Sequence, residues 1–334
     1  MKQPNRRPNA VDVARLAGVS KSTVSRAFTE DSSINALKKQ RIIEAARQLG
    51  YRPNAMARSL RTTRSNLVGI LLEEFTNPIF LRILELITAK LQEHGLHAIT
   101  VNASKDHSLS EAMELVMQYR IDGLIVSSDM PLKIEYECAQ MNIPVVAFAR
   151  SDRRIENTLS VSLDEFHAGR MAARHLLEQG YRAPAFIGGF PGVSVSLDRH
   201  AGFRDHLAEE GLRVVAVEYA GDNTYDRGLA AGKALLEGPT RPDSVFCVND
   251  QVAVGVIDAA RFLGLSVPED LGVIGVDDIW MARTAQYDLT TVLQPLEAMA
   301  DALIALLMGR ETGTDQSTQF EGTLVPRGST RRKA

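Results

Sequence analysis

Apolar and polar positions in the first fifty residues alternate with the period of an α-helix. In AVDVARLAGVSKSTVSRAF (residues 10–28), the apolar positions pause at Gly18, a residue type that readily takes the positive φ of a tight turn between two helices. A first helix is therefore predicted before this turn. Its apolar positions are Val13, Ala14, Leu16 and Ala17.

A second helix is predicted directly after the turn. Ser20 is a suitable N-cap, because its hydroxyl accepts a hydrogen bond from an N–H of the first helical turn. The buried stripe of this helix would consist of Val24, Ala27 and Phe28, which leaves the opposite face to Lys21, Ser22, Ser25 and Arg26. Small polar and basic side chains on such a helix suit insertion into a DNA major groove, although helix–glycine–helix units also occur in structural bundles.

The stretch LKKQRIIEAARQLG predicts a third helix that ends at Gly50. Three helices within the first fifty residues can close a small core. The apolar stripe of the third helix is Leu37, Ile42, Ala45, Ala46 and Leu49.

A second basic segment follows in YRPNAMARSLRTTRSNLVGIL (residues 51–71). Pro53 biases the residue before it away from the helical region, and the few residues up to Leu60 are too short for a helix that is stable alone in water. We expect this segment to fold only on a partner. Leu60 suits a wedge that enters a bent minor groove between phosphates, or alternatively packs on the next domain. It is flanked by Arg58, Arg61 and Arg64.

From residue 66 onward, short apolar runs alternate with amphipathic stretches. This alternation predicts parallel sheets covered by helices on both faces, and a break near residue 163 predicts two doubly wound subdomains with a cleft between them. The strand candidates are Leu67–Leu72, Ala98–Val101, Gly123–Ser127, Val145–Phe148, Val161–Leu163, Ala185–Ile187, Val214–Glu218, Val245–Val248, Val273–Val276 and Thr291–Leu293. The helix candidates are residues 78–94, 110–120, 132–141, 165–179, 199–210, 226–237, 250–263 and 295–308.

Composition is that of a soluble globular protein: the chain has 334 residues, 45% of them hydrophobic and 24% charged. This length predicts two or three domains. No stretch approaches the roughly 18 to 20 apolar residues of a membrane span, and the N-terminus lacks the apolar run of a signal peptide. We therefore expect a cytoplasmic protein without a membrane partner.

Charge is distributed unevenly, although the net charge of the whole chain is only −3. Residues 1–64 carry fourteen Lys and Arg against four Asp and Glu, a net charge of +10, so the remaining 270 residues carry −13. A basic N-terminal segment joined to an acidic remainder indicates binding of a polyanion, the alternative being a solvated basic face.

The sequence contains no motif typical of an enzyme or of a metal site. Cys138 and Cys247 lie far apart in apolar runs and are interpreted as core residues. The sequence GGFPG at 188–192 is neither a dinucleotide-binding nor a phosphate-binding loop, and no catalytic serine or histidine–metal motif is found. Adjacent side chains of an extended stretch point in opposite directions, so Asp277 and Asp278 need not form a carboxylate pair. We expect no catalytic activity, no cofactor and no metal.

Polar residues follow the predicted strands, where ligands bind in doubly wound folds. Arginines, amides and carboxylates that converge from several strand ends suit a hydroxyl-rich or anionic small molecule. Each of them alone is more often a loop or cap residue, so only the set is informative. The set is Asn77, Ser127, Ser128, Arg150, Asp164, Asn249, Asp250, Asp277 and Asp278.

The stretch VDVARLAGVSKSTVSRAF, followed by LGYRPNAMARSLRT, resembles the lactose-repressor (LacI/GalR) family of bacterial transcription regulators. The resemblance continues through NPIF, DGLIVSS, IPVVAFAR, DRHAGFRDHL, VFCVNDQVAVG, VPEDLGVIGVDDI and LTTVLQPLEAM, in the order of that family. It implies an N-terminal all-α helix-turn-helix headpiece (1–52), a hinge helix and linker (53–65), and an α/β effector-binding and dimerisation domain (66–334) with two doubly wound, periplasmic-binding-protein-like subdomains. The first subdomain would comprise about 66–163 and 294–320, and the second about 164–293.

The same resemblance implies a role for particular residues. After the turn, Lys21 and Ser22 would read bases, while Thr23, Ser25 and Arg26 would contact phosphates and bases. In the hinge, Leu60 would be the minor-groove wedge, with Asn54, Ala57 and Arg58 lining the groove. The effector would be bound by Asn77, Phe80 and Arg150 from the first subdomain and by Arg199, Asn249 and Asp277 from the second. The implied partners are a palindromic double-stranded operator, a small-molecule effector, and further copies of the chain in a homodimer or tetramer.

The sequence also departs from the family pattern. Family members often place an aromatic ring after the GD of GDNTYDRG, where this chain has Asn223. We therefore expect a small polar or acidic effector, such as a sugar acid, over a nucleobase. The third helix lacks the usual threonine cap, because INALKKQRI replaces VSxxTRxRV. The ending LVPRGST is interpreted as native sequence.

Three functions are compatible with these patterns to different degrees. A ligand-controlled DNA-binding repressor of a catabolic or transport operon accounts for both the basic segment and the cleft. A sugar-binding receptor for transport would need export, which the expected lack of a signal peptide and the basic segment disfavour. An enzyme on the same α/β scaffold is disfavoured by the lack of a nucleophile, metal or cofactor motif.

Overall fold

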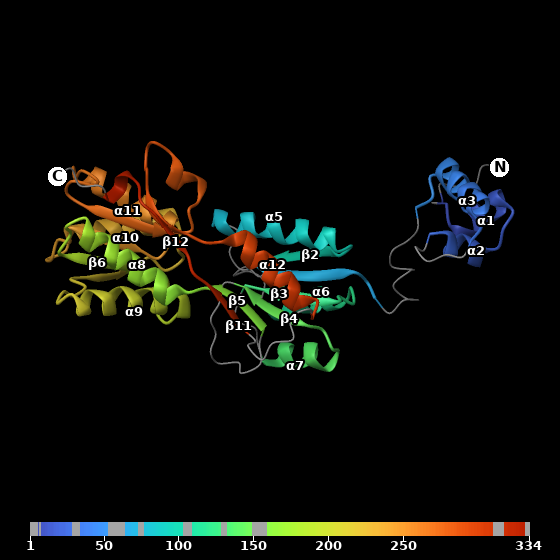
Figure 1. Ribbon diagram of the computed structural model, residues 1–334, viewed down its shortest axis with the longest axis horizontal. Helices are drawn as coiled ribbons and strands as arrows, with labels where there is room; N and C mark the ends of the chain where they lie inside the picture. Colours follow the sequence, from blue (N-terminus) through green and yellow to red (C-terminus); the bar gives the residue numbers. More distant parts are fainter. Residues whose placement is uncertain are drawn as a thin grey trace. The chain divides into compact units, whose positions relative to one another are not determined.

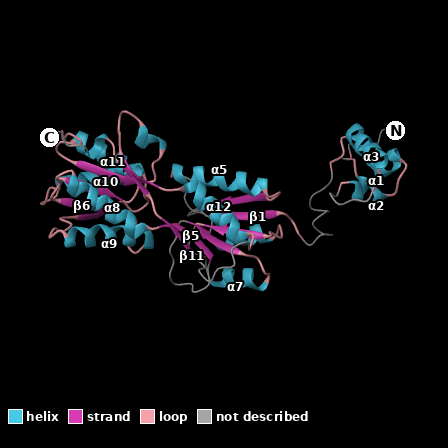
Figure 2. Cartoon of the chain, viewed as in Figure 1, coloured by secondary structure: helices cyan, strands magenta, loops and turns pink. Residues whose placement is uncertain are grey.

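The computed structural model describes residues 6, 8–28, 34–52, 64–72, 77–102, 109–127, 132–148, 159–309 and 317–330. The chain divides into two compact units, which we call the head (Met1–Asn66) and the body (Leu67–Ala334). Figure 1 shows their elements in chain order, and Figure 2 shows that the helices of the head contrast with the mixed helices and strands of the body.

The head contains α1 (Ala10–Ala17), α2 (Lys21–Ala27) and α3 (Ala36–Leu49). The turn after α1 forms as predicted, because Gly18 adopts a left-handed conformation with φ of 64°. The hydroxyl of Ser20 then accepts the N–H of Thr23 and caps α2, which confirms the predicted cap.

The core of the head differs from the predicted stripes at two leucines. Leu16 is 51% exposed and Leu37 is 78% exposed, whereas the core contains Val13, Ala14, Ala17, Val24, Ala27, Ile42, Ala45 and Ala46. Both leucines lie at the margin of an apolar stripe, where helical periodicity does not distinguish a core position from a surface position. The missing threonine cap of α3 is replaced by Asn35, whose side chain accepts the N–H of Leu37.

The first half of the body is built on a parallel sheet of six described strands in the order β11-β5-β4-β3-β1-β2. Helices α5 and α12 cover one face through a shared apolar cluster, and α6 and α7 cover the other. The strands are β1 (Leu67–Leu72), β2 (His97–Asn102), β3 (Gly123–Val126), β4 (Val145–Phe148), β5 (Leu159–Leu163) and β11 (Ser317–Phe320). The helices are α5 (Pro78–Glu93), α6 (Leu109–Met117), α7 (Leu132–Gln140) and α12 (Leu296–Leu307).

The second half has a sheet of six described strands in the order β12-β10-β9-β8-β6-β7, in which only β12 runs antiparallel to its neighbour. Helices α8 and α9 cover one face, and α10 and α11 cover the other. The strands are β6 (Pro184–Gly188), β7 (Val217–Tyr219), β8 (Ser244–Cys247), β9 (Gly272–Val276), β10 (Thr290–Leu293) and β12 (Thr323–Val325). The helices are α8 (Glu165–Glu178), α9 (Ser194–Glu209), α10 (Tyr225–Glu237), α11 (Asp250–Phe262), and the short 3-10 helices η1 (Trp280–Arg283) and η2 (Gly328–Thr330).

The described chain passes between the two halves after β5, after β10 and between β11 and β12. Several crossings of this kind are typical of two lobes that close around a ligand. Among the described residues, no helix has the length and apolar character needed to cross a membrane.

Several body elements differ from their predictions. The strand predicted at Val214–Glu218 is the shorter β7, and α9 begins at Ser194 rather than residue 199, in a stretch without a continuous apolar stripe. The edge strands β11 and β12 were not predicted, because STQF is largely polar and TLV is only three residues long. They pair with β5 and β10. The ending LVPRGST belongs to the fold, since Ser329 and Thr330 are buried against the second sheet.

Candidate functional site

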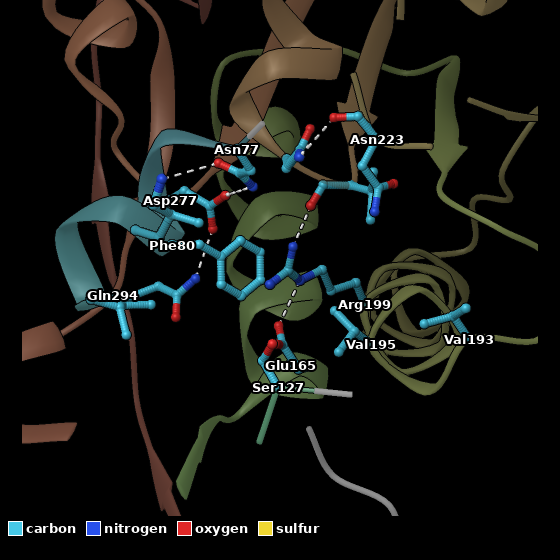
Figure 3. A pocket seen from close by; sticks show the side chains of 14 residues that line it. Asn77, Phe80, Ser127, Glu165, Val193, Val195, Arg199, Asn223, Asp277 and Gln294 are labelled. Atoms are coloured by element: carbon cyan, nitrogen blue, oxygen red, sulfur yellow. Dashed lines mark hydrogen bonds and ion pairs between the residues drawn. The ribbon is translucent and has the colours of Figure 1, made fainter. Parts of the chain in front are cut away.

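A cavity of about 140 Å³ lies between the two halves of the body. Residues of both halves line it, which is the position that the doubly wound fold favours for ligands. The polar lining residues are Asn77, Ser127, Glu165, Arg199, Asn223, Asn249, Asp277 and Gln294, most of which are labelled in Figure 3.

One side of the cavity is closed by hydrogen bonds to the carboxylate of Asp277, which follows β9. Asn77 Nδ2 donates to Asp277 Oδ2 at 3.2 Å, and Gln294 Nε2 donates to Asp277 Oδ1 at 2.7 Å. Asn77 is the N-cap of α5 in the first half, so this bond joins the two halves directly. Burial raises the pKa of Asp277, opposed by Arg199 and by the two amide donors.

Arg199 and Glu165 form a buried ion pair on another side of the cavity. Arg199 Nε donates to Glu165 Oε2 at 2.5 Å, and Arg199 Nη1 donates to the carbonyl of Val248. The two side chains are only 5% and 4% exposed. Burial disfavours the charged guanidinium, but the Glu165 carboxylate more than offsets this effect, so the pKa of Arg199 lies above its ordinary value.

Close packing of α8 on α9 brings this pair together. A Cβ on Gly169 would lie 2.1 Å from the backbone oxygen of Arg199, and one on Gly202 would lie 1.9 Å from the backbone oxygen of Phe166. Only glycine fits at these two positions, which lets the backbones approach and places Glu165, at the start of α8, against Arg199 of α9.

Two asparagines complete the polar lining from the second half. Asn249 caps α11, since its Oδ1 accepts the N–H of Val252, and its Nδ2 donates to the carbonyl of Asn223. Asn223 lies in the left-handed region with φ of 53°. Its Oδ1 is buried without a hydrogen-bond partner among the described residues, so this atom is available to accept a hydrogen bond from a ligand.

Apolar side chains form the rest of the wall, and the ring of Phe80 lies among the polar groups in Figure 3. A cavity with amide, guanidinium and carboxylate groups beside an apolar surface can hold a small ligand with hydroxyl groups and a non-polar face. The apolar lining residues are Ile79, Phe80, Ile83, Val193, Val195 and Val248.

The structure brings together most of the residues that sequence analysis assigned to the effector. Asn77, Phe80, Arg199, Asn249 and Asp277 all line the cavity, as does Ser127. Arg150 and Ser128 lie outside the described residues.

Three other residues at strand ends bond to the surrounding fold and do not line this cavity. Asp164 caps α8 at the N–H of His167, and the buried Asp250 accepts from Thr291 Oγ1 and from the N–H of Ile279. Asp278 binds Arg283 and Arg327, whereas Asp277 faces the cavity, so the two adjacent carboxylates serve different partners as expected.

Glu165 and Gln294 are cavity residues that sequence reasoning missed. Glu165 follows the strand-end residue Asp164, which was itself selected, so its position was a usable signal. Gln294 directly follows β10, where the same rule would have found it. Among the described residues, no three His, Cys, Asp or Glu side chains are grouped to hold a metal ion.

The head presents its candidate residues on the surface of α2. Lys21, Ser22 and Arg26 are exposed, and Thr23 and Ser25 are half-buried beside the core residues of the same helix. The Ser20 hydroxyl lies 2.8 Å from the hydroxyls of both Ser22 and Thr23, which ties the start of the exposed face to the cap. The hinge residues Asn54, Ala57, Arg58 and Leu60 lie outside the described residues.

Comparison with known proteins assigns both units. Residues 11–54 match the bacterial regulatory proteins of the lacI family, and residues 173–330 match a periplasmic binding protein-like domain. The ribose operon repressor of Escherichia coli (strain K12) is 31% identical over 325 residues, covering 95% of this chain and 98% of that protein. The HTH-type transcriptional repressor PurR of Erwinia tasmaniensis is 34% identical over 313 residues, covering 92% of each chain.

Comparison with solved structures also finds transcription regulators. The lac repressor dimer bound to operator and the anti-inducer ONPF matches with a TM-score of 0.86 at 23% identity, over 97% of this chain and 99% of that chain. The complex of the transcriptional regulator CelR with cellobiose matches with a TM-score of 0.71 at 27% identity, over 97% of this chain and 100% of that chain. The chain therefore belongs to the lacI family of bacterial regulatory proteins, which are DNA-binding transcription regulators and not enzymes.

Proposed function

We propose that this protein is a cytoplasmic repressor of a catabolic or transport operon, released from or held on its operator by a small polar effector. The observation that carries the proposal is the hydrogen bond from Asn77 to Asp277, which joins the two halves of the body across a cavity of polar residues. A ligand in this cavity contacts both halves and stabilises one arrangement of them relative to another. The name of one relative, a ribose operon repressor, favours a sugar. Asn223, at the position of the aromatic ring common in the family, favours a small polar or acidic effector such as a sugar acid.

The head would bind DNA as one half of a homodimer, or of a pair within a tetramer, on a palindromic operator. Lys21 and Ser22 would read bases in the major groove, while Thr23, Ser25 and Arg26 would contact phosphates and bases. The exposure of α2 and the basic charge of residues 1–64 support this role. In the hinge, Leu60 would enter the minor groove, with Asn54, Ala57 and Arg58 beside it.

DNA binding, coupling and effector binding would belong to separate segments, with the domain bounds that the sequence suggests. Residues 1–52 would be the DNA-binding domain, 53–65 the hinge helix and linker, and 66–334 the effector-binding and dimerisation domain. Within the last, one subdomain would comprise about 66–163 and 294–320, and the other about 164–293. Asn77, Phe80 and Arg150 would bind the effector from the first, and Arg199, Asn249 and Asp277 from the second.

Coupling between the sites would use the connections between the halves. Closure around the effector shifts the first half, which begins at β1, directly after the hinge. A useful switch needs about 1–3 kcal/mol of coupling free energy, and operator DNA must then change effector affinity by the same factor.

Selection of duplexes from a random library by the full-length protein tests the proposal. We expect enrichment of one palindromic sequence, and we expect a sugar or sugar acid from a systematic panel to change its measured affinity about 5- to 150-fold. Failure to enrich any duplex contradicts the DNA-binding role. Enrichment without a response to any member of the panel contradicts the proposed effector class.

A further inference from the structure

The cavity contains its own counter-ion for Arg199. Glu165 lines the cavity beside the guanidinium, bonded to Nε, and both side chains are almost fully buried. A guanidinium has five N–H donors, and the structure commits only part of them to Glu165 and Val248. Arg199 can therefore still donate hydrogen bonds to a ligand, but its positive charge is already neutralised.

Glu165 is subject to opposed effects: burial and the nearby Asp277 raise the pKa of its carboxyl, whereas Arg199 lowers it. Glu165 is the first residue of α8, where the helix dipole and the unpaired N–H groups stabilise a carboxylate. Asp277 adds a second carboxyl group to the cavity, so the described lining contains two acidic side chains and one basic side chain. Within this described lining, an anionic ligand would meet two carboxyl groups and a guanidinium that is already paired with one of them.

We propose that Glu165 determines the ligand specificity of this cavity. Its carboxyl group makes the cavity select uncharged hydroxyl-rich ligands such as neutral sugars and reject anionic ligands such as sugar acids. The inference rests on the proposed function, because it takes the cavity to be the effector site. It narrows the effector class suggested above to its uncharged members. Hydroxyl and ring oxygens accept hydrogen bonds from Arg199 without adding a charge.

Inorganic sulfate is a suitable probe, because it presents the charged oxygens that an uncompensated buried arginine binds. Calorimetric titration of the full-length protein, without DNA, compares wild type with Glu165→Gln, which removes the charge and keeps the shape. We expect Glu165→Gln to bind sulfate at least about tenfold more tightly than wild type, since the opposed charge is lost. The gain should vanish in Glu165→Gln/Arg199→Met. Because the head is identical in these proteins, any sulfate that it binds cancels in the comparison.

Glu165→Asp is the matched control, because it changes the side-chain length and retains the negative charge. It should gain no sulfate affinity. A pair that only joins α8 to α9 makes a different prediction: neither substitution would create an anion site. Equal sulfate affinity of wild type and Glu165→Gln overturns the proposal.

Wild type provides a second measurement that does not depend on the folding of a variant. Its body should show no saturable increase in melting temperature with sulfate relative to chloride at equal ionic strength. A saturable increase that competes with a neutral sugar effector overturns the proposal. These outcomes are independent of the operator: loss of the DNA-binding role leaves the sulfate comparison intact, and a failed sulfate comparison leaves operator selection intact.

Discussion

The head and the body display their functional residues in opposite ways. The candidate DNA-reading side chains lie within one short helix, α2, and several of them are exposed. The cavity residues come from positions as far apart in sequence as Asn77 and Gln294, and many of them are buried. A short local sequence is therefore sufficient to form the reading surface, whereas the sensing cavity exists only when both halves of the body are folded.

The head and the body also differ in how much a substitution costs in folding stability. Exposed charged side chains contribute little to folding, so the head can change its reading residues at small cost in stability. In the body, Arg199 and Glu165 form a buried ion pair. Removing either side chain alone therefore leaves a buried, uncompensated charge. The two regions should respond differently to salt, substitution and pH.

The largest expected effect is that of salt on the head. If a dimer neutralises about eight phosphates, the logarithm of the operator association constant should fall against the logarithm of salt concentration with a slope of about −7. Between about 50 and 200 mM salt this corresponds to roughly a 10⁴-fold loss of affinity. Fluorescence anisotropy at several salt concentrations measures the slope. A slope near zero on a specific duplex would contradict a polyelectrolyte interface.

The second effect concerns the stability of the body. Arg199→Met leaves Glu165 buried without its partner, and we expect it to lower the free energy of unfolding by about 3–5 kcal/mol. The double variant Glu165→Gln/Arg199→Met removes both charges and should recover most of this loss. Denaturant unfolding of the three proteins measures the cycle. Equal stability of the single variant and wild type would mean that the pair is solvated.

The third effect is specific to recognition. Arg26→Ala removes an exposed side chain of α2, so operator binding should weaken by about 1–3 kcal/mol while the melting temperature stays unchanged. Arg15→Ala, on the exposed surface of α1, is the control for loss of one positive charge. Competition against duplexes altered at single positions separates the variants, because only Arg26→Ala should relax base preference. Identical base preferences of the two variants would show that the DNA-reading surface does not lie on α2.

The smallest effect is that of pH on the body. His175 Nε2 lies 2.8 Å from Thr330 Oγ1, and burial lowers the pKa of His175, partly opposed by Glu178. As pH falls below about 6.5, the unfolded chain takes up a proton that the folded ring resists, so the protonation of this histidine destabilises the fold. The loss begins near the unfolded pKa and is complete below the folded one.

Melting curves of wild type and His175→Gln across this pH range measure the contribution. The difference between the two proteins is the informative quantity, because burial raises the pKa of Asp250, and protonation of that carboxyl acts in the opposite direction. Wild type should lose more stability than His175→Gln as the pH falls. Parallel curves would show that the ring at position 175 is hydrated.

Much of the fold could be predicted because the decisive signals are local. The strand Leu67–Leu72 was predicted with the bounds it has, since a short, fully apolar run next to an amphipathic stretch is typical of a buried parallel strand. The turn at Gly18 and the cap at Ser20 follow from the conformational preferences of single residues. Position relative to a strand end was enough to select Asn77 and Asp277 as candidate site residues.

Only the tertiary structure decided which apolar residues are buried and which charges meet. Leu16 and Leu37 satisfy the helical pattern but remain exposed, because burial depends on which face another helix covers. Strand β11 is largely polar and strand β12 has only three residues, and both form by pairing with partners distant in the sequence. Glu165 meets Arg199 through the glycine contacts of α8 with α9, so the charge of the cavity is a property of helix packing that periodicity along the chain does not encode.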